Sequence, residues 1–245
     1  MDSLLRSAMQ DGSFGTGTRP GAGREGDDRP KTGRRSFLGR GAAAVAAGVA
    51  AFSGREARAG NPNYLPSLYA NENVMEFKQI QADENNHVTF LKTALGANAR
   101  PEPTFQGLNM PNLVTFAETA MALENTGTGA YLGAAPYIYN PDYLVAAAMI
   151  LPIEARHASY LNVLLNNNLL LNSLGEVPGN SLEVPLTLDQ VVAKASPFVA
   201  SLNGGPPLSF STTPSAANDI AILNFALALE YLESSFYNLN VPIFT

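Results

Sequence analysis

The sequence predicts an all-α protein built as an antiparallel four-helix bundle. Four segments have the length and the one-sided apolar pattern of bundle helices, and we expect them at residues 72–95, 111–135, 142–166 and 216–238. No segment alternates apolar and polar residues as a half-buried strand does. Two of the four segments also carry Glu-x-x-His on the apolar face, where a purely structural core rarely places charge.

The expected helix ends follow from turn-forming residues. The first helix stops at Gly96, because glycine favours the backbone conformation that ends a helix. Pro111 suits the first turn of the second helix, and the third begins after Asn140-Pro141. The fourth helix is expected to end before Pro242, which lacks the N–H group needed to continue it.

Two connections separate these helices. Residues 97–110 form a linker rich in Pro, Gly and Asn. Residues 167–215 form a long connection rich in Asn, Pro, Ser and Gly. Within it we expect a shorter helix from Thr187 to Leu202, interrupted at Pro197.

Charge and composition divide the chain into residues 1–59 and a bundle domain of residues 60–245. Residues 1–33 have no apolar period and are expected to be disordered. Residues 61–245 hold five basic and fifteen acidic side chains, a formal charge of −10. A body this acidic is not expected to bind nucleic acid, but it attracts cations. The absence of Cys excludes disulfides and thiolate metal sites.

The segment before residue 60 resembles a twin-arginine export signal. Arg34 and Arg35 precede an apolar stretch at residues 41–52, which is too short to span a bilayer as a helix. Ala57 and Ala59 form a small-x-small pattern typical of signal cleavage. We therefore expect an exported protein, periplasmic or extracellular, with no stable membrane span after cleavage. An ordinary secretory signal or an uncleaved tail is the alternative.

The two His residues of the chain both occur in Glu-x-x-His motifs, Glu84–His87 and Glu154–His157. A separation of three places both side chains on one face of a helix, about 5–6 Å apart at Cβ, so that one metal ion can bind both. Both motifs fall on the inward apolar stripe of their helices. A single buried His is more often a hydrogen-bonded core residue, but two such pairs with buried carboxylates favour a metal site.

The second and fourth helices each place one glutamate, Glu124 and Glu230, on the inward stripe. Four Glu and two His from four helices are typical of bundles that hold two iron or two manganese ions. Four carboxylates balance two divalent cations, and oxygen with imidazole ligands favours iron or manganese over structural zinc. The predicted ligands are Glu84, His87, Glu124, Glu154, His157 and Glu230.

Three further residues are expected near the metals. Asp83 precedes a predicted ligand and can hydrogen-bond an imidazole from outside, or else be a solvated acid. Tyr131 and Tyr237 are interpreted as hydrogen-bond donors or redox neighbours of the metals, with plain core aromatics as the alternative.

Several other polar and small residues are expected to have structural roles only. Glu233 is expected at the surface or at a helix cap, and Glu118 in solvent. Gly127, Gly129 and Gly133 are expected to allow close helix packing, although glycine weakens a helix by about 1 kcal/mol relative to Ala.

The sequence resembles the ferritin-like domain of desiccation-related proteins and their bacterial relatives. The resemblance covers most of residues 63–240, and the paired Glu-x-x-His motifs are its most specific part. The matching stretches are ADENNHVTFLKTALGA (82–97), ALENTGTGAYLGAAP (122–136), IEARHASYLNVLL (153–165) and ILNFALALEYLESSFY (222–237).

The order of these stretches departs from the family. Family members usually begin with a helix like residues 222–237, which here comes last. A circular permutation explains the change, because the termini of a bundle lie close together. The alternative is a homodimer in which this helix is swapped between subunits.

The resemblance implies a stress-protective protein whose two iron ions, or two manganese ions, react with dioxygen or peroxide. Ferroxidase-like oxidation of Fe(II) and consumption of peroxide are the expected enzymatic activities. The alternative is a non-enzymatic desiccation- or stress-related protein that packs or binds a partner and keeps a structural or vestigial metal site. Metal content measured together with turnover distinguishes the two.

Overall fold

The computed structural model describes residue 65 and residues 71–165, 171–176 and 181–245. The chain divides into two units, residues 1–57 and 58–245, and every described residue belongs to the second. The expected disorder of residues 1–33 and the expected signal residues lie outside the described residues. These signal residues are Arg34, Arg35, Ala57 and Ala59.

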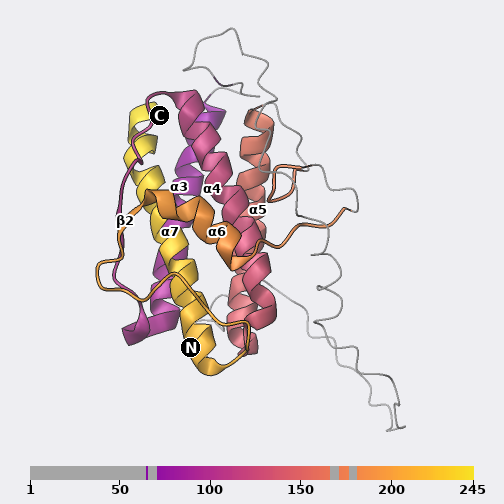
Figure 1. The fold of residues 1–245 in the computed structure, drawn as a ribbon. Coiled ribbons are helices and arrows are strands. Elements are labelled where there is room, and N and C mark those ends of the chain that lie inside the picture. The colour runs from indigo at the N-terminus through magenta and orange to yellow at the C-terminus, as the bar shows by residue number, and fades with distance from the viewer. Residues whose placement is uncertain (1–64, 66–70, 166–170, 177–180) are drawn as a thin grey trace, which may run out of the picture. The chain divides into compact units, whose positions relative to one another are not determined.

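The described part of the chain is mostly helical, which confirms the all-α prediction (Figure 1). Its long helices are α3 (Glu72–Leu95), α4 (Leu113–Ala134), α5 (Pro141–Leu164) and α7 (Ala216–Phe244). The short α6 (Leu188–Ala195) lies against α4. Single 3-10 turns follow three helices, at Gly96–Asn98, Ala135–Tyr137 and Ser196–Phe198. Among the described residues, no helix combines the length and apolarity needed to cross a bilayer.

The long helices pack in pairs, α3 on α7 and α4 on α5, and α4 also contacts α7. The Gln81 amide in α3 donates to Asn238 Oδ1 near the end of α7, at 2.9 Å. Just beyond the C-terminal end of α3, the Asn98 carbonyl accepts from Asn224 Nδ2 near the start of α7, also at 2.9 Å. Helices α3 and α7 therefore run antiparallel. The C-terminal helix therefore packs against α3 and α4 of its own chain.

Local capping explains most of the helix boundaries. Asn112, Asn140 and Ser215 precede α4, α5 and α7, and each side chain accepts a backbone N–H from the first turn. These bonds satisfy donors that would otherwise have no partner within the helix. Gly96 ends α3 with φ 55°, a conformation that favours glycine, and its N–H donates to the Lys92 carbonyl. Helix α3 has the bounds expected from the sequence.

The predicted end of the fourth helix is wrong, because α7 continues through Pro242 to Phe244. A proline this close to the C-terminus removes one helical hydrogen bond and leaves the rest of the helix intact. The last turn also gains packing, since the Phe244 ring stacks on Phe116 with 5.6 Å between centroids, and Val241 is buried. Tertiary contact therefore outweighs the local break.

The described residues also contain one short antiparallel ladder that the sequence did not predict. Strand β1 (Thr104–Phe105) pairs with β2 (Val199–Ser201). The expected helix from Thr187 to Leu202 is correspondingly shorter, because α6 ends at Ala195 and Pro197 lies in a 3-10 turn. Strands of two and three residues are too short to produce a detectable alternation.

The glycines of α4 allow a connecting segment to cross it. Leu186 N donates to the Gly129 carbonyl at 3.0 Å. A Cβ atom at Gly133 would lie 2.0 Å from the Leu186 carbonyl oxygen. At Gly129 and Gly133 the closely packed segment is therefore the connection before α6, and not another helix as the sequence predicted.

Candidate metal centre

All six predicted ligand side chains lie in one buried cluster, with contributions from α3, α4, α5 and α7. The four carboxylates are fully buried, and the two imidazole-bearing residues are 6–8% exposed. The six residues are Glu84, His87, Glu124, Glu154, His157 and Glu230. A cluster with this burial costs free energy unless the charges find partners.

The cluster contains two overlapping groups of ligand atoms, each with all its atoms within 4.8 Å of one another. Glu84 and Glu154 belong to both groups. One group is completed by Glu124 and His157, and the other by His87 and Glu230. Each group could hold a metal ion, with the motif carboxylates common to both groups and one His and one Glu particular to each.

The ring nitrogens show the same geometry in detail. His87 Nδ1 lies 3.3 Å from a Glu84 oxygen and 3.2 Å from oxygens of both Glu154 and Glu230. His157 Nδ1 lies 3.0 Å from Glu84 and 3.1 Å from Glu124. A ring nitrogen carries at most one proton, so it cannot hydrogen-bond all these oxygens. With metal–ligand bonds of about 2.1 Å, neighbouring ligand atoms lie about 3.0–3.4 Å apart.

Several carboxylate oxygens of the cluster have no hydrogen-bond partner. They are Glu84 Oε1, both Glu154 side-chain oxygens and Glu230 Oε2. Glu84 Oε1, Glu154 Oε1 and Glu230 Oε2 do lie near ring nitrogens, but without hydrogen-bond geometry. Buried acceptors without a donor are costly, and a divalent cation would satisfy them. The residues present therefore fit a pair of hard cations.

Tyr131 and Tyr237 hold the two end carboxylates. The Tyr237 hydroxyl, on α7, donates to Glu124 Oε1 on α4 at 2.6 Å. The Tyr131 hydroxyl, on α4, donates to Glu230 Oε1 on α7. Each tyrosine follows a cluster glutamate by seven residues on its own helix and bonds the glutamate of the other helix. The structure therefore places both tyrosines as hydrogen-bond donors at the cluster.

Asp83 lies behind one imidazole. Its Oδ2 atom is 3.3 Å from His157 Nε2, the ring nitrogen that faces away from the cluster. A carboxylate in this position fixes the ring orientation and leaves Nδ1 toward the other ligands. The side chain is 27% exposed, so Asp83 also remains in contact with solvent.

The expectation that Glu233 lies at the surface is wrong. The residue is 3% exposed, and its Oε2 atom has no hydrogen-bond partner. On the neighbouring helix, Gly127 makes room for Glu154 rather than for Glu233, because a Cβ there would lie 2.3 Å from Glu154 Oε2 but 3.4 Å, an ordinary contact distance, from Glu233 Oε1. The burial of Glu233 could have been suspected from the sequence, because Glu233 follows Glu230 by three residues and so lies on nearly the same helix face. Glu118 is half-buried on α4 and outside the cluster.

Burial and mutual repulsion change the proton affinities of the cluster. Burial, followed by repulsion from Glu124, raises the pKa of Glu84 to about 7, and burial raises the pKa of Glu154 well above its ordinary value. Burial lowers the pKa of His157, but the carboxylates of Glu124 and Glu84 outweigh it and raise the pKa to about 11. The pKa of His87 is raised in the same way by its carboxylate contacts. Without metal, the cluster therefore retains protons at neutral pH.

Metal binding is expected to release protons. Ions must displace the protons held by His87, His157 and Glu84, so apparent affinity should rise from about pH 5 to about pH 8. Calorimetric titration of the metal-free chain with Mn²⁺, in buffers of different ionisation enthalpy, measures the protons released. A binding enthalpy independent of buffer, with affinity constant over this range, would contradict the expectation.

Comparison with known proteins gives one match. A family model described as a ferritin-like domain matches residues 42–167, just over half of the chain. The matched region contains α3, α4 and α5, begins within the expected export signal and ends before α7. No curated protein and no solved structure matches the chain.

Proposed function

The chain belongs to the ferritin-like domain family, and from this premise we propose that it is an exported redox protein that uses a pair of iron ions to consume dioxygen or peroxide. The observation that carries the proposal is the buried cluster of four carboxylates and two imidazoles, in which two sets of ligand atoms share Glu84 and Glu154. A closely related proposal is that the chain binds a pair of manganese ions and dismutates peroxide. Protection against oxidative stress is the biological outcome that we propose.

The chemistry divides between the bound ions and the protein. When bound, two ferrous ions would supply the electrons for reduction of dioxygen or peroxide. Glu84 and Glu154 keep the two positions adjacent. The hydroxyls of Tyr131 and Tyr237 fix Glu230 and Glu124 by donating to one oxygen of each, which leaves the other oxygen directed to the centre.

Helix α7 supplies Glu230 to the cluster within a single chain, 3.2 Å from His87 Nδ1. We propose that α7 takes the place of the first helix of other family members, which makes the chain a circular permutation. On this proposal a swapped helix is not needed to complete the centre. A homodimer would then form through another surface.

The direct test is oxidation of Fe(II) by the full chain. Anaerobic protein loaded with two Fe(II) per chain is mixed with dioxygen or with hydrogen peroxide in a stopped-flow spectrometer. We expect oxidation about 100-fold faster than that of free Fe(II), since general enzymatic acceleration exceeds this level. A Glu118→Ala variant is the control and should react as the wild type does.

The same experiment separates the non-enzymatic alternative. Tight metal binding with no acceleration for either oxidant, and no dioxygen evolved from peroxide by the manganese-loaded chain, would favour a packing protein with a structural metal. Diffraction at the iron and manganese absorption edges identifies the resident metal.

Export is proposed from Arg34 and Arg35. The double substitution Arg34→Lys/Arg35→Lys is expected to leave the precursor in the cytoplasm, because the paired arginines are the receptor-read part of the signal. Cell fractionation followed by immunoblotting measures the distribution. The matched control is Arg24→Lys/Arg29→Lys, which changes the same residue type upstream. Normal export and trimming of the first variant would show that the twin-arginine interpretation is wrong.

A further inference from the structure

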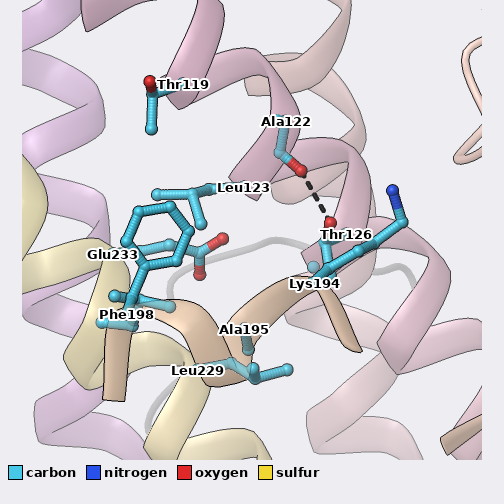
Figure 2. A pocket seen from close by; sticks show the side chains of 11 residues that line it. Thr119, Ala122, Leu123, Thr126, Lys194, Ala195, Phe198, Leu229 and Glu233 are labelled. Atoms are coloured by element: carbon cyan, nitrogen blue, oxygen red, sulfur yellow. Dashed lines mark hydrogen bonds between the residues drawn. The ribbon is translucent and has the colours of Figure 1, made fainter. Parts of the chain in front are cut away.

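A cavity of about 130 Å³ lies beside the metal centre, between α4, α7 and the segment from α6 to Phe198 (Figure 2). Its walls are mostly apolar, formed by Leu123, Phe198, Leu229 and Leu232. At its mouth the cavity reaches solvent beside the exposed residues Ala122 and Lys194. The remaining lining residues are Thr119, Thr126, Gly127, Ala195 and Glu233.

The inner end of the cavity carries a buried acid. Figure 2 shows the Glu233 carboxyl group extending from α7 into the space enclosed by the lining residues. The residue is 3% exposed, and its Oε2 atom has no hydrogen-bond partner. An unpartnered buried oxygen in an apolar cavity is a place where a ligand donor or acceptor gains a hydrogen bond without displacing an existing one.

This inner end also adjoins the metal centre. The space that a side chain at Gly127 would need is occupied by Glu154: an ideal Cβ there would lie 2.3 Å from Glu154 Oε2 and 3.4 Å from Glu233 Oε1. The two carboxylate oxygens are therefore at most the sum of these distances apart. A molecule bound to Glu233 would lie next to a carboxylate shared by both ligand groups.

Size and polarity limit the occupant. An apolar cavity of about 150 Å³ accepts one benzene molecule, so a single ring is close to the upper limit here. Apolar walls do not replace the hydration of an ion, which favours a neutral occupant over a cation or a small anion. A hydroxyl group both donates and accepts, so it can bond the Glu233 carboxyl group whether that group is ionised or protonated.

We propose that this cavity binds a small, mostly apolar molecule with one hydroxyl group, of the size of phenol, with the hydroxyl on Glu233. The site is separate from the metal ligands, and its occupancy does not depend on the redox reaction proposed above. It gives the chain an organic ligand next to the metal centre.

The test is titration of the full chain, as purified and without added oxidant, with phenol and with benzene. Ligand-observed NMR gives both dissociation constants. We expect phenol to bind at least about tenfold more tightly than benzene, because benzene leaves the buried carboxyl group unpaired. Glu233→Gln retains a donor and an acceptor and should preserve this preference, whereas Glu233→Leu should abolish it.

A second pair of variants locates the binding. Ala122 is exposed at the mouth, so Ala122→Trp should fold and weaken phenol binding at least about tenfold by closing the entrance. The matched control is Ala82→Trp, at an exposed position of α3 outside the cavity lining, which should bind phenol as the wild type does.

The outcomes that overturn the proposal are specific. They are no saturable phenol binding up to about 10 mM, phenol binding unchanged by Ala122→Trp, or a phenol preference that survives Glu233→Leu. Because the readout is binding, failure here leaves the proposed oxidation of Fe(II) untouched. Absence of Fe(II) oxidation would likewise leave this result intact.

Discussion

A Glu84→Gln variant should lose both metal ions, whereas Glu124→Gln should lose one. Glu84 contributes a ligand atom to both groups, and Glu124 to only one of them. Glutamine keeps the shape of the side chain but cannot supply the negative charge that balances a divalent ion. Elemental analysis of metal per chain, after saturation and removal of free metal, should give about two ions for the wild type, about one for Glu124→Gln and near zero for Glu84→Gln.

The histidines provide an independent form of this experiment. His87→Ala/His157→Ala removes one nitrogen ligand from each position and should abolish both occupancy and reaction with oxidant. Its far-ultraviolet circular dichroism should still show formed helices, because both residues are small parts of otherwise apolar helix faces. Glu118→Gln serves as the control and should retain two ions. Wild-type protein with fewer than about one ion per chain, or a fully active double-His variant, would contradict the di-metal proposal.

Removal of metal is expected to destabilise the fold by several kcal/mol. A ligand present at 100 to 1,000 times its dissociation constant stabilises the native state by about 2.7–4.1 kcal/mol per site. In a chain of this size each kcal/mol corresponds to about 2–4 °C in Tm, so a chelator should lower Tm by about 10 °C or more. Thermal unfolding followed by circular dichroism, before and after chelation and after restoring Mn²⁺, measures the change.

The reason for this loss is the charge of the empty cluster. Without cations, the protons held by Glu84, Glu154, His87 and His157 relieve only part of the repulsion among the four buried carboxylates. The double-His variant supplies the control, since a chain that cannot bind metal should have the same Tm with and without chelator. A wild-type Tm that does not respond to chelation would argue against two occupied sites.

The helices were predictable because their signals are local. The apolar period and the caps at Asn140 and Gly96 lie within a few residues of the boundaries that they determine. The end of α7 was not, because the helix continues past Pro242 through the stacking of Phe244 on a ring 128 positions away in the sequence. The β1–β2 ladder depends in the same way on a pairing between distant segments.

For the candidate site, too, the local features were predictable and those that depend on distant segments were not. The six candidate ligand residues were evident from two Glu-x-x-His motifs and two inward glutamates, since helix geometry alone fixes which face each residue occupies. The sharing of Glu84 and Glu154 depends on how far each helix is displaced along its neighbours. The burial of Glu233 depends on the segments that pack over α7, so the spacing on its own helix was not sufficient.

The crossed hydrogen bonds of Tyr131 and Tyr237 reveal a repeated pattern. A Glu-x-x-His helix precedes a helix with glutamate and tyrosine seven apart, first with Glu124 and Tyr131 and then with Glu230 and Tyr237. The donors around the two positions are therefore nearly identical. Two interchangeable positions would fill without preference and would not distinguish one metal from another.

The pattern is broken at two points, and both lie beside the cluster. Asp83 supports His157 from behind, while its counterpart before the second motif is Ile153, which cannot accept a hydrogen bond. Glu233 follows its cluster glutamate by three residues, and the counterpart on α4 is Gly127. Because of these inequalities we expect a loading order, in which one position fills first when less than two equivalents of a single metal are offered.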